Sequence, residues 1–352
     1  MKIEPDACGF DWEDWHKQLA NSVTTIEELK KINLEEDQII DLPNLPIKIT
    51  PYYLKLIKDN PILKRTVIPS EKEFIISDYE NSDPLSEEQY KKTACIIHKY
   101  PNRVLFTVTK QCASYCRYCT RSRMVGNDKN FNKKDWEDAF EYIKNNDIKD
   151  VLLSGGDGLM LTNSQLEFLL NKITEIPNVD IVRIGTKMPI VLPFRVDSGL
   201  IEILKRYNEI KSIYINLHVT HPAEITKEFI EACKKLSIDG GCILGSQTVI
   251  LKGINDDSNI LKELFHKLLK NRVRPYYAYQ MDKISGGSHF RVDIEKFINL
   301  QKELISYNSG LEVPDFILDS EIGKIPLRID FVVRDNGKYI LNSFEKNKSI
   351  EY

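Results

Sequence analysis

The sequence lacks the marks of an exported or membrane-spanning protein. Its longest apolar runs are only as long as β-strands, so we expect no segment that crosses a membrane. The first residues, Met1 to Ala7, do not show the basic segment followed by an apolar one that a secretory signal has. The seven cysteines are an odd number in a chain of 352 residues, which argues against a framework of disulfide bonds. We therefore expect a cytoplasmic protein.

A strong charge of either sign is also missing. The formal net charge is −3, so nothing indicates binding to nucleic acid or to a membrane surface. Hydrophobic residues make up 42% of the chain and charged residues 29%, which is ordinary for a globular protein. The length suits one large α/β domain, or a core domain with appendages.

Residues 1–100 are predicted to form a mainly helical extension. The segments Trp12–Ala20 and Thr25–Ile32 have helical spacing, and Thr25 is a suitable N-cap with glutamates in the turn that follows. Prolines then interrupt the chain before another short helix at Tyr52–Lys58. We find no catalytic pattern in this part and expect it to pack as a collar on the main domain.

Residues 101–310 alternate between strands and helices. Six apolar, β-branched runs have the length of strands, and each is followed by a segment with helical periodicity. The predicted strands are Val104–Thr109, Asp150–Ser154, Ile181–Thr186, Ser212–Val219, Cys242–Ile250 and Arg274–Gln280. The predicted helices are Lys134–Asn145, Ser164–Ile176, Ser198–Tyr207, Glu224–Leu236, Asn259–Leu269 and Ile294–Tyr307. Six such units in a row imply parallel strands joined by right-handed crossovers.

Two α/β architectures fit this order, an open doubly wound sheet and a partial (β/α)6 barrel of the TIM type. Polar residues follow the carboxyl end of every predicted strand. A barrel brings such residues from all its strands to one mouth, whereas a doubly wound sheet concentrates them at one switch point. We therefore expect the partial barrel.

Residues 311–352 are predicted to form a small β appendage. Asp315–Asp319 and Arg328–Val333 have the composition of short strands. The Asn336-Gly337 pair then predicts a tight turn into a strand at Tyr339–Leu341. We expect this appendage to close the open side of the barrel.

Three cysteines follow the first predicted strand of the barrel. Cys112, Cys116 and Cys119 have the spacing CxxxCxxC on one short loop. Structural zinc normally takes four protein ligands, whereas a [4Fe–4S] cluster on three cysteines leaves one iron open for a ligand that is not protein. The cluster is the favoured interpretation, and a zinc site completed by Cys95 or His98 is the alternative.

Other candidate site residues stand near the ends of later strands. The Gly155-Gly156-Asp157 segment is either a simple turn or a source of exposed backbone and a carboxylate for an amino acid group bound at the open iron. His218 and Gln247 lie in apolar strands, where a purely structural role is common for such residues.

Two carboxylates, a set of arginines and one lysine complete the candidates. Asp282 and Asp319 at strand ends must be paired or solvated, and together they suit a cationic head group. The arginines near the cysteine loop are either solvated or grip a carboxylate or phosphate in bidentate fashion. They are Arg103, Arg117, Arg121 and Arg123. Lys324 is by itself only one lysine among many.

These residues, in this order, resemble the radical S-adenosylmethionine (SAM) enzymes, and more narrowly the lysine 2,3-aminomutase family. The similarity runs from about Asp83 to the C-terminal hairpin. It rests on the cysteine loop with Thr120-Arg121 and on His98–Val104, Leu152–Asp157, Val182–Gly185, Pro189–Pro193, His221-Pro222, Gly253–Asp256 and Arg274–Tyr277.

The resemblance implies a radical SAM barrel with a [4Fe–4S] cluster on the three cysteines and SAM at its open iron. Reductive cleavage of SAM would give a 5′-deoxyadenosyl radical that abstracts the β-hydrogen of an amino acid. His218 and Gln247 match family positions near SAM. Lys324 matches the lysine that binds pyridoxal 5′-phosphate (PLP), and Arg103 matches a residue near the PLP phosphate. Arg121 matches the clamp on the substrate carboxylate.

The resemblance also implies a substrate. Asp282 and Asp319 match the carboxylates that hold the ε-ammonium of lysine, so we expect an L-lysine 2,3-aminomutase that makes β-lysine. Two departures from the family pattern stand out: the segment Asp319–Lys324 is short and has a single glycine, and no zinc-binding cysteine follows Cys242.

Several alternatives stay open. The same amino shift on arginine, or on a lysine of elongation factor P, is the nearest one. A radical enzyme without PLP and a zinc-stabilised barrel without enzymatic activity are others. The expected partners are a small amino acid substrate and an electron donor such as flavodoxin or ferredoxin, with a homo-oligomer as a further possibility.

Overall fold

One large sheet organises the structure. The computed structural model describes residues 5, 8–32, 45–126, 130–327, 332–335, 338–342 and 349–351. Nine strands follow one another in chain order in the large sheet, with β2 to β8 parallel and with β1 and β9 antiparallel at the two edges. They are β1 (Ile96–Tyr100), β2 (Arg103–Thr109), β3 (Asp150–Gly155), β4 (Ile181–Thr186), β5 (Ser212–His218), β6 (Ile243–Ile250), β7 (Val273–Gln280), β8 (Asp315–Ser320) and β9 (Gly323–Pro326).

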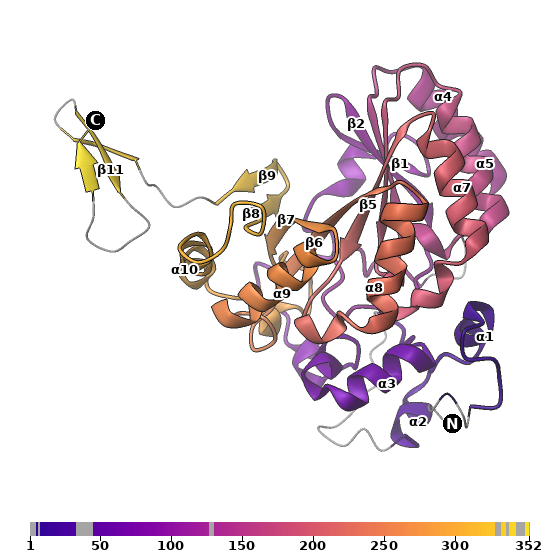
Figure 1. Ribbon diagram of the computed structural model, residues 1–352, viewed down its shortest axis with the longest axis horizontal. Coiled ribbons are helices and arrows are strands. Elements are labelled where there is room, and N and C mark those ends of the chain that lie inside the picture. Colours follow the sequence, from indigo (N-terminus) through magenta and orange to yellow (C-terminus); the bar gives the residue numbers. More distant parts are fainter. Residues whose placement is uncertain are drawn as a thin grey trace.

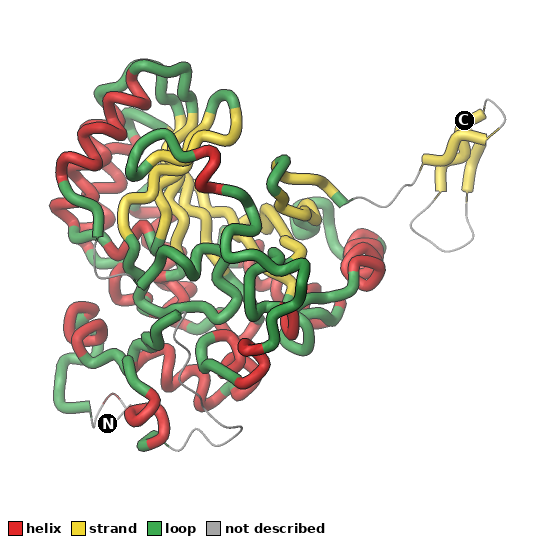
Figure 2. The backbone as a smooth tube through the Cα atoms, turned by 180° about the vertical axis from the view of Figure 1, so that it is seen from behind, coloured by secondary structure: helices red, strands yellow, loops and turns green. Residues whose placement is uncertain are grey.

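Helices connect the parallel strands and cover the outer face of the sheet (Figure 1). They are α4 (Lys133–Lys144), α5 (Asn163–Thr174), α6 (Met188–Val191), α7 (Ser198–Asn208), α8 (Lys227–Lys234), α9 (Ser258–Lys270) and α10 (Ile294–Ile305). In α4 the buried residues Trp136, Ala139, Phe140 and Ile143 recur at the spacing of one helix face. The strands curve together inside this layer, as the view from behind shows (Figure 2). The predicted partial barrel is confirmed.

One predicted helix differs at both ends. The segment expected to begin at Glu224 forms a 3₁₀ turn over Pro222–Glu224, and α8 begins only at Lys227. The Glu224 carboxylate accepts hydrogen bonds from the amides of Thr220 and His221, which holds it at the strand end rather than on the helix face. After α8 the chain continues as a π-helical turn, Lys235–Asp239.

The described part of the N-terminal extension packs on the barrel. Its helices are α1 (Trp15–Ala20), α2 (Ile26–Lys30) and α3 (Pro51–Asp59), followed by 3₁₀ turns at Pro61–Thr66, Glu71–Phe74 and Glu87–Tyr90. Thr25 caps α2 as predicted, in a reciprocal capping box with Glu28. The buried hydroxyl of Tyr53 donates a hydrogen bond of 2.8 Å to Glu224, which ties α3 to the end of β5.

The barrel is closed between its two edge strands, β1 and β9, and β9 belongs to the segment predicted as the β appendage. The amide of Lys324 in β9 donates to the hydroxyl of Tyr100 in β1 at 3.1 Å, and the Lys99 ammonium donates to the carbonyl of Ser320. Tyr90 adds a hydrogen bond of 3.2 Å to the carbonyl of Glu321. These side chains join β1 to the β8–β9 hairpin without a backbone ladder between them.

The tail forms a separate sheet of β10 (Val332–Asp335), β11 (Lys338–Asn342) and β12 (Ser349–Glu351). This sheet lies apart from the barrel in Figure 1. The segment predicted as one β appendage is thus divided: β8 and β9 extend the barrel sheet and reach β1, whereas β10, β11 and β12 form the separate sheet. The predicted Asn336-Gly337 turn and residues 328–331 of a predicted strand lie outside the described residues. In the part of the chain that the structure describes, no helix has the length and apolar character needed to cross a membrane.

Candidate active site

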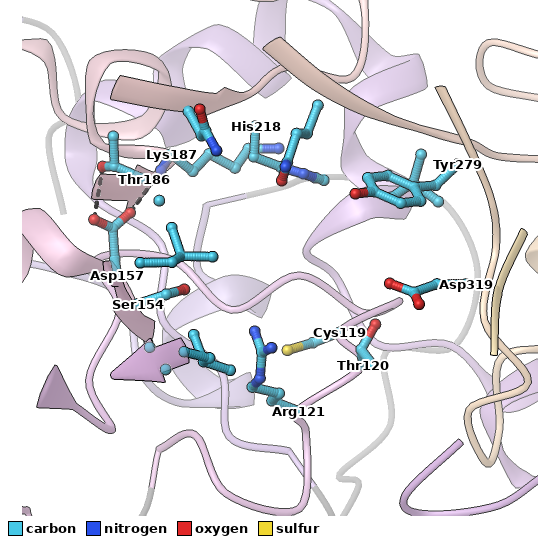
Figure 3. Close-up of a pocket in the computed structure, with 18 of the residues that line it drawn as sticks. Cys119, Thr120, Arg121, Ser154, Asp157, Thr186, Lys187, His218, Tyr279 and Asp319 are labelled. Atoms are coloured by element: carbon cyan, nitrogen blue, oxygen red, sulfur yellow. Dashed lines mark hydrogen bonds between the residues drawn. The ribbon is translucent and has the colours of Figure 1, made fainter. Parts of the chain in front are cut away.

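A cavity of about 510 Å³ lies inside the barrel, and every candidate site residue in the cluster, cofactor and substrate sets lines it. Figure 3 shows part of its wall, with side chains from the cysteine loop and from several strand ends pointing inward. The residues so gathered are Arg103, Cys112, Cys116, Cys119, Arg121, Gly155, Gly156, Asp157, His218, Gln247, Asp282, Asp319 and Lys324.

The cysteine loop is fixed at its start by the end of β3. The amide of Gly156 donates to the carbonyl of Thr109 at 2.7 Å, and the amide of Asp157 donates to the carbonyl of Gln111 at 2.9 Å. A Cβ on Gly156 would lie 2.3 Å from the Gln111 carbonyl oxygen, and Gly155 has a φ of +102°. Both positions therefore need glycine, one for close approach and one for its backbone conformation. The two bonded amides are occupied by the loop and are not free for a ligand.

The carboxylate of Asp157 is also engaged with the protein. It accepts hydrogen bonds from the hydroxyl of Thr186 at 2.6 Å, the amide of Lys187 at 2.6 Å and the amide of Leu159 at 2.9 Å, and the first two are drawn in Figure 3. Burial raises the pKa of Asp157, and these hydrogen bonds oppose the rise. Asp157 thus joins the ends of β3 and β4 beneath the cavity.

The three cysteines supply a suitable donor set for an iron–sulfur cluster. All three are free thiols on the cavity wall. Burial raises the pKa of Cys112 well above the usual range and that of Cys119 to about 12, and the neighbouring cysteines add to both shifts. Cysteines bind a metal cluster as thiolates, and the positive charge of an iron–sulfur core would stabilise that form here.

The arrangement favours a cluster over a single metal ion. Within the described residues no three His, Cys, Asp or Glu side chains form a group that could hold one metal ion. A [4Fe–4S] cluster binds each cysteine to a different iron, so its ligands need not converge on one point. Cys95 and His98, the candidate fourth ligands of a zinc site, are not among the residues that line the cavity.

A buried polar network backs the cysteine loop at the ends of β4 and β5. The hydroxyl of Tyr118 bonds to Nε2 of His218 at 2.8 Å and to the hydroxyl of Thr220 at 2.9 Å. Lys187 donates to Thr220 at 3.2 Å and forms a 3.0 Å ion pair with Glu224. Burial alone would lower the pKa of Lys187, but Glu224 outweighs it and raises that pKa. Burial, with Lys187 nearby, lowers the pKa of His218 to about 3, so this histidine is neutral.

The predicted substrate carboxylates already have protein partners. The Thr120 hydroxyl donates to Asp282 at 2.5 Å, and the Lys324 ammonium pairs with Asp319. Asp319 and Lys324 face each other across the β8–β9 hairpin, so the short segment between them is a tight turn. Burial raises the pKa of Asp282 to about 6, and repulsion from Asp319 adds to the rise.

Arg121 points into the cavity from the cysteine loop (Figure 3). Its Nε and Nη2 atoms donate to the carboxylate of Glu87, with distances of 3.0, 3.1 and 2.6 Å. Burial alone would raise the pKa of Glu87, but Arg121 and Arg123 outweigh it and lower that pKa. The neighbouring Arg117, also buried, forms a 2.6 Å ion pair with Glu73. The extension thus holds the cysteine loop through two arginines.

Arginine and tyrosine side chains form the end of the cavity near β1 and β2. The Arg103 guanidinium lies 3.9 Å from the ring centre of Tyr100, a residue that also accepts the Lys324 amide. Arg183 of β4 lines the same end and donates to Asp150 at 2.8 Å. This end of the cavity suits an anionic group.

Three buried polar atoms on the cavity wall have no hydrogen-bond partner among the described residues. They are Oγ of Ser114, Nδ2 of Asn216 and Oε1 of Gln280. A buried polar group without a partner is costly, so such atoms indicate that the cavity holds a polar ligand or ordered water.

Comparison with known proteins decides the family. Residues 106–264 match the model of the Radical SAM superfamily. The L-lysine 2,3-aminomutase of Methanococcus maripaludis is 41% identical, with 98% of this chain and 82% of that protein covered. The L-lysine 2,3-aminomutase of Clostridium subterminale is 40% identical, with 97% and 84% covered. The chain belongs to the lysine 2,3-aminomutase family of radical SAM enzymes. A family member named glutamate 2,3-aminomutase, from Clostridioides difficile, is 37% identical, with 94% and 80% covered.

Membership in the lysine 2,3-aminomutase family makes the protein an isomerase that uses a [4Fe–4S] cluster and SAM. The described cavity fits both groups, since it combines three cysteines on one loop with polar atoms that have no partner among the described residues. One of the related proteins is named glutamate 2,3-aminomutase. Family membership alone therefore does not determine which amino acid this protein converts.

Sequence reasoning missed several residues of this aminomutase site. Glu87, Lys187 and Tyr279 line the cavity, but each lies in a segment without a distinctive motif. Thr120 was noted only as the continuation of the cysteine loop, although its hydroxyl reaches Asp282. No local pattern near Arg121 could have identified Glu87, because the segment around Arg121 contains no acidic residue.

The close contact at Gly156 generates a prediction. Gly156→Ala places a methyl group against the Gln111 backbone, so the cysteine loop must shift. We expect the variant to bind much less iron and sulfide after anaerobic reconstitution and to lose about 1–3 kcal/mol of stability. Gly310→Ala is the matched control, because its Cβ would meet no atom within 4 Å. Equal iron content in the two variants would contradict the role of the Gly156 contact in placing the cysteine loop.

Proposed function

We propose that the protein is a PLP-dependent L-lysine 2,3-aminomutase, which moves the α-amino group of L-lysine to C3 and gives β-lysine. The observation that carries this proposal is the pair of carboxylates, Asp282 and Asp319, in the same cavity as Arg121. Lysine has a carboxylate at one end and an ammonium at the other. An arginine and a carboxylate pair complement these two charges in one binding site.

The electrostatics of the cavity favour a cation over an anion at the side-chain end. Repulsion between Asp282 and Asp319 contributes to the raised pKa of Asp282, which means that the two carboxylates lie close enough to interact. A positively charged side chain relieves this repulsion, whereas the side-chain carboxylate of glutamate increases it. Lysine therefore suits this cavity better than glutamate.

Lys324 is the residue proposed to bind PLP. Its ammonium lies 5.4 Å from the ring centre of Tyr279 and faces the cavity, and the guanidinium of Arg103 is available nearby for the phosphate. Arg183 lies at the same end, where it is paired with Asp150. When bound, PLP would supply a conjugated ring to which the migrating amino group is attached. The residues present fit such a group.

The partners follow from this chemistry. Reduction of the cluster requires a one-electron donor, and we expect flavodoxin or ferredoxin to serve. Arginine and a lysine of elongation factor P are also cationic and form the second candidate class of substrate, because the same carboxylate pair suits them. Assembly into a homo-oligomer stays a prediction.

The deciding experiment is an anaerobic assay of the reconstituted protein with a chemical reductant, SAM and PLP. Separate reactions receive L-lysine, L-arginine, L-glutamate and elongation factor P, and the β-amino products are separated and identified. We expect β-lysine from free lysine at a rate far above the other three. A β-amino product only from another substrate would overturn the lysine assignment while leaving the aminomutase chemistry intact.

The raised pKa of Asp282 predicts a pH dependence. Below about pH 6 this carboxyl gains a proton and no longer attracts the ε-ammonium, so kcat/KM for lysine should rise between about pH 5 and pH 7. Thr120→Val removes a hydrogen bond that lowers this pKa, and the inflection should then move to higher pH. The other charged groups facing Asp282 are Asp319, Lys324 and Arg121, which the variant leaves in place. An unchanged inflection would assign the pH profile to another group.

Covalent attachment of PLP is a separate prediction. Treatment of the PLP-loaded protein with borohydride should fix the cofactor to the peptide that contains Lys324, as peptide mass spectrometry would show. Lys324→Ala should abolish this label and the visible absorbance of the bound cofactor. Lys99→Ala is the control, because Lys99 lines the same cavity near the β8–β9 hairpin. A label that stays in Lys324→Ala would place the cofactor elsewhere.

A further inference from the structure

The Arg121 guanidinium is held along one edge only. Its Nε and Nη2 atoms face the two oxygens of Glu87 in a bidentate pair, with the shortest distance 2.6 Å. Among the described residues no hydrogen bond is made by its Nη1 atom. An arginine has two such edges, so the edge formed by Nη1 and the second Nη2 hydrogen stays available to a ligand.

Glu87 is itself firmly placed. Its side chain is only 7% exposed, and its backbone amide donates to Asp83 at 3.0 Å at the start of the 3₁₀ turn Glu87–Tyr90. Arg123 supplies a second cation, whose Nη2 lies 3.4 Å from Glu87 and 3.0 Å from Asp83. A buried carboxylate with two arginines and a capped turn has little freedom to move.

Two roles are open to a carboxylate in this place. It either positions Arg121 for a ligand, or competes with the ligand for the guanidinium. Competition requires both carboxylates to use the same edge of the arginine. The pair with Glu87 uses the Nε edge, whereas the guanidinium points into the cavity (Figure 3). The geometry therefore favours positioning.

We propose that Glu87 is a positioning residue, which fixes Arg121 so that its second edge receives the α-carboxylate of the amino acid substrate. This inference rests on the proposed function, because it requires an amino acid in the cavity. It gives the N-terminal extension an indirect part in substrate recognition, because Glu87 acts through Arg121 and does not itself touch the substrate.

The test compares an amino acid with its carboxamide. Wild-type protein, Glu87→Gln and the control Glu88→Gln are reconstituted with the cluster and assayed with the amino acid that the wild type converts and with its amide. Glu88 is the matched control, since it is adjacent but 63% exposed and does not contact Arg121 in the described structure. Iron content and the melting temperature are measured for each protein.

We expect the preference for the acid over the amide, as a ratio of kcat/KM values, to fall roughly 10- to 30-fold in Glu87→Gln, because Arg121 regains its rotamer freedom. The loss should appear mainly in KM for the acid, and Glu88→Gln should keep the wild-type ratio. If Glu87→Gln fails to take up the cluster, Glu87→Asp is measured instead, and the same fall is expected from its shorter reach.

Three results would overturn the inference. An unchanged ratio in a well-loaded Glu87→Gln protein would mean that Arg121 needs no positioning. A tighter KM for the acid would identify Glu87 as a competitor of the substrate. If the wild type converts no free amino acid, the proposed function fails as well, and the wild-type assay alone shows that this is the case.

Discussion

Two backbone hydrogen bonds at the end of β3 hold the start of the cysteine loop, and the rest of the site depends on where this loop lies. The Gly156 amide donates a hydrogen bond to the Thr109 carbonyl, and the Asp157 amide donates one to the Gln111 carbonyl. The two segments lie so close together that a side chain at Gly156 has no room. This contact sets where the cysteine loop leaves β2. The cluster ligands, Thr120 and Arg121 all follow in the same loop. A shift of these two hydrogen bonds would therefore displace all of them together.

Three ion pairs lie at the cavity wall or directly behind it. Arg121 pairs with Glu87, Lys187 with Glu224 and Lys324 with Asp319. Buried ions without partners are very costly, so these pairs allow the ligand-free barrel to contain the charges that its chemistry needs. The pair of Lys324 and Asp319 differs from the others, because both members are proposed to take new partners. Binding at this pair is therefore an exchange of charges rather than the burial of new ones.

Much of the barrel could be predicted from the sequence. The six predicted strands and six predicted helices of the barrel lie within a few residues of their predicted bounds, because apolar periodicity is a local signal, whereas the short helix α6 was not predicted. The candidate residues gather in one cavity because the carboxyl ends of parallel strands meet at one mouth. The ion-pair partners of the charged side chains could not be predicted in this way. Glu87 and Arg121 are 34 residues apart, and a side-chain pair between distant segments leaves no periodic trace. The edge strand β1 was also missed, because it lies in a segment that was predicted to be mainly helical.

Thr120 and Arg121 follow directly after the last cysteine, and each contacts a different carboxylate. The hydroxyl of Thr120 contacts Asp282, while Arg121 is set beside Glu87. The distance between these two contact points is thus fixed by a single peptide unit of a loop that the cluster also restrains. Asp282 and Asp319, by contrast, stand at the ends of β7 and β8, so a change at these two positions leaves the loop that carries the cysteines and Arg121 in place.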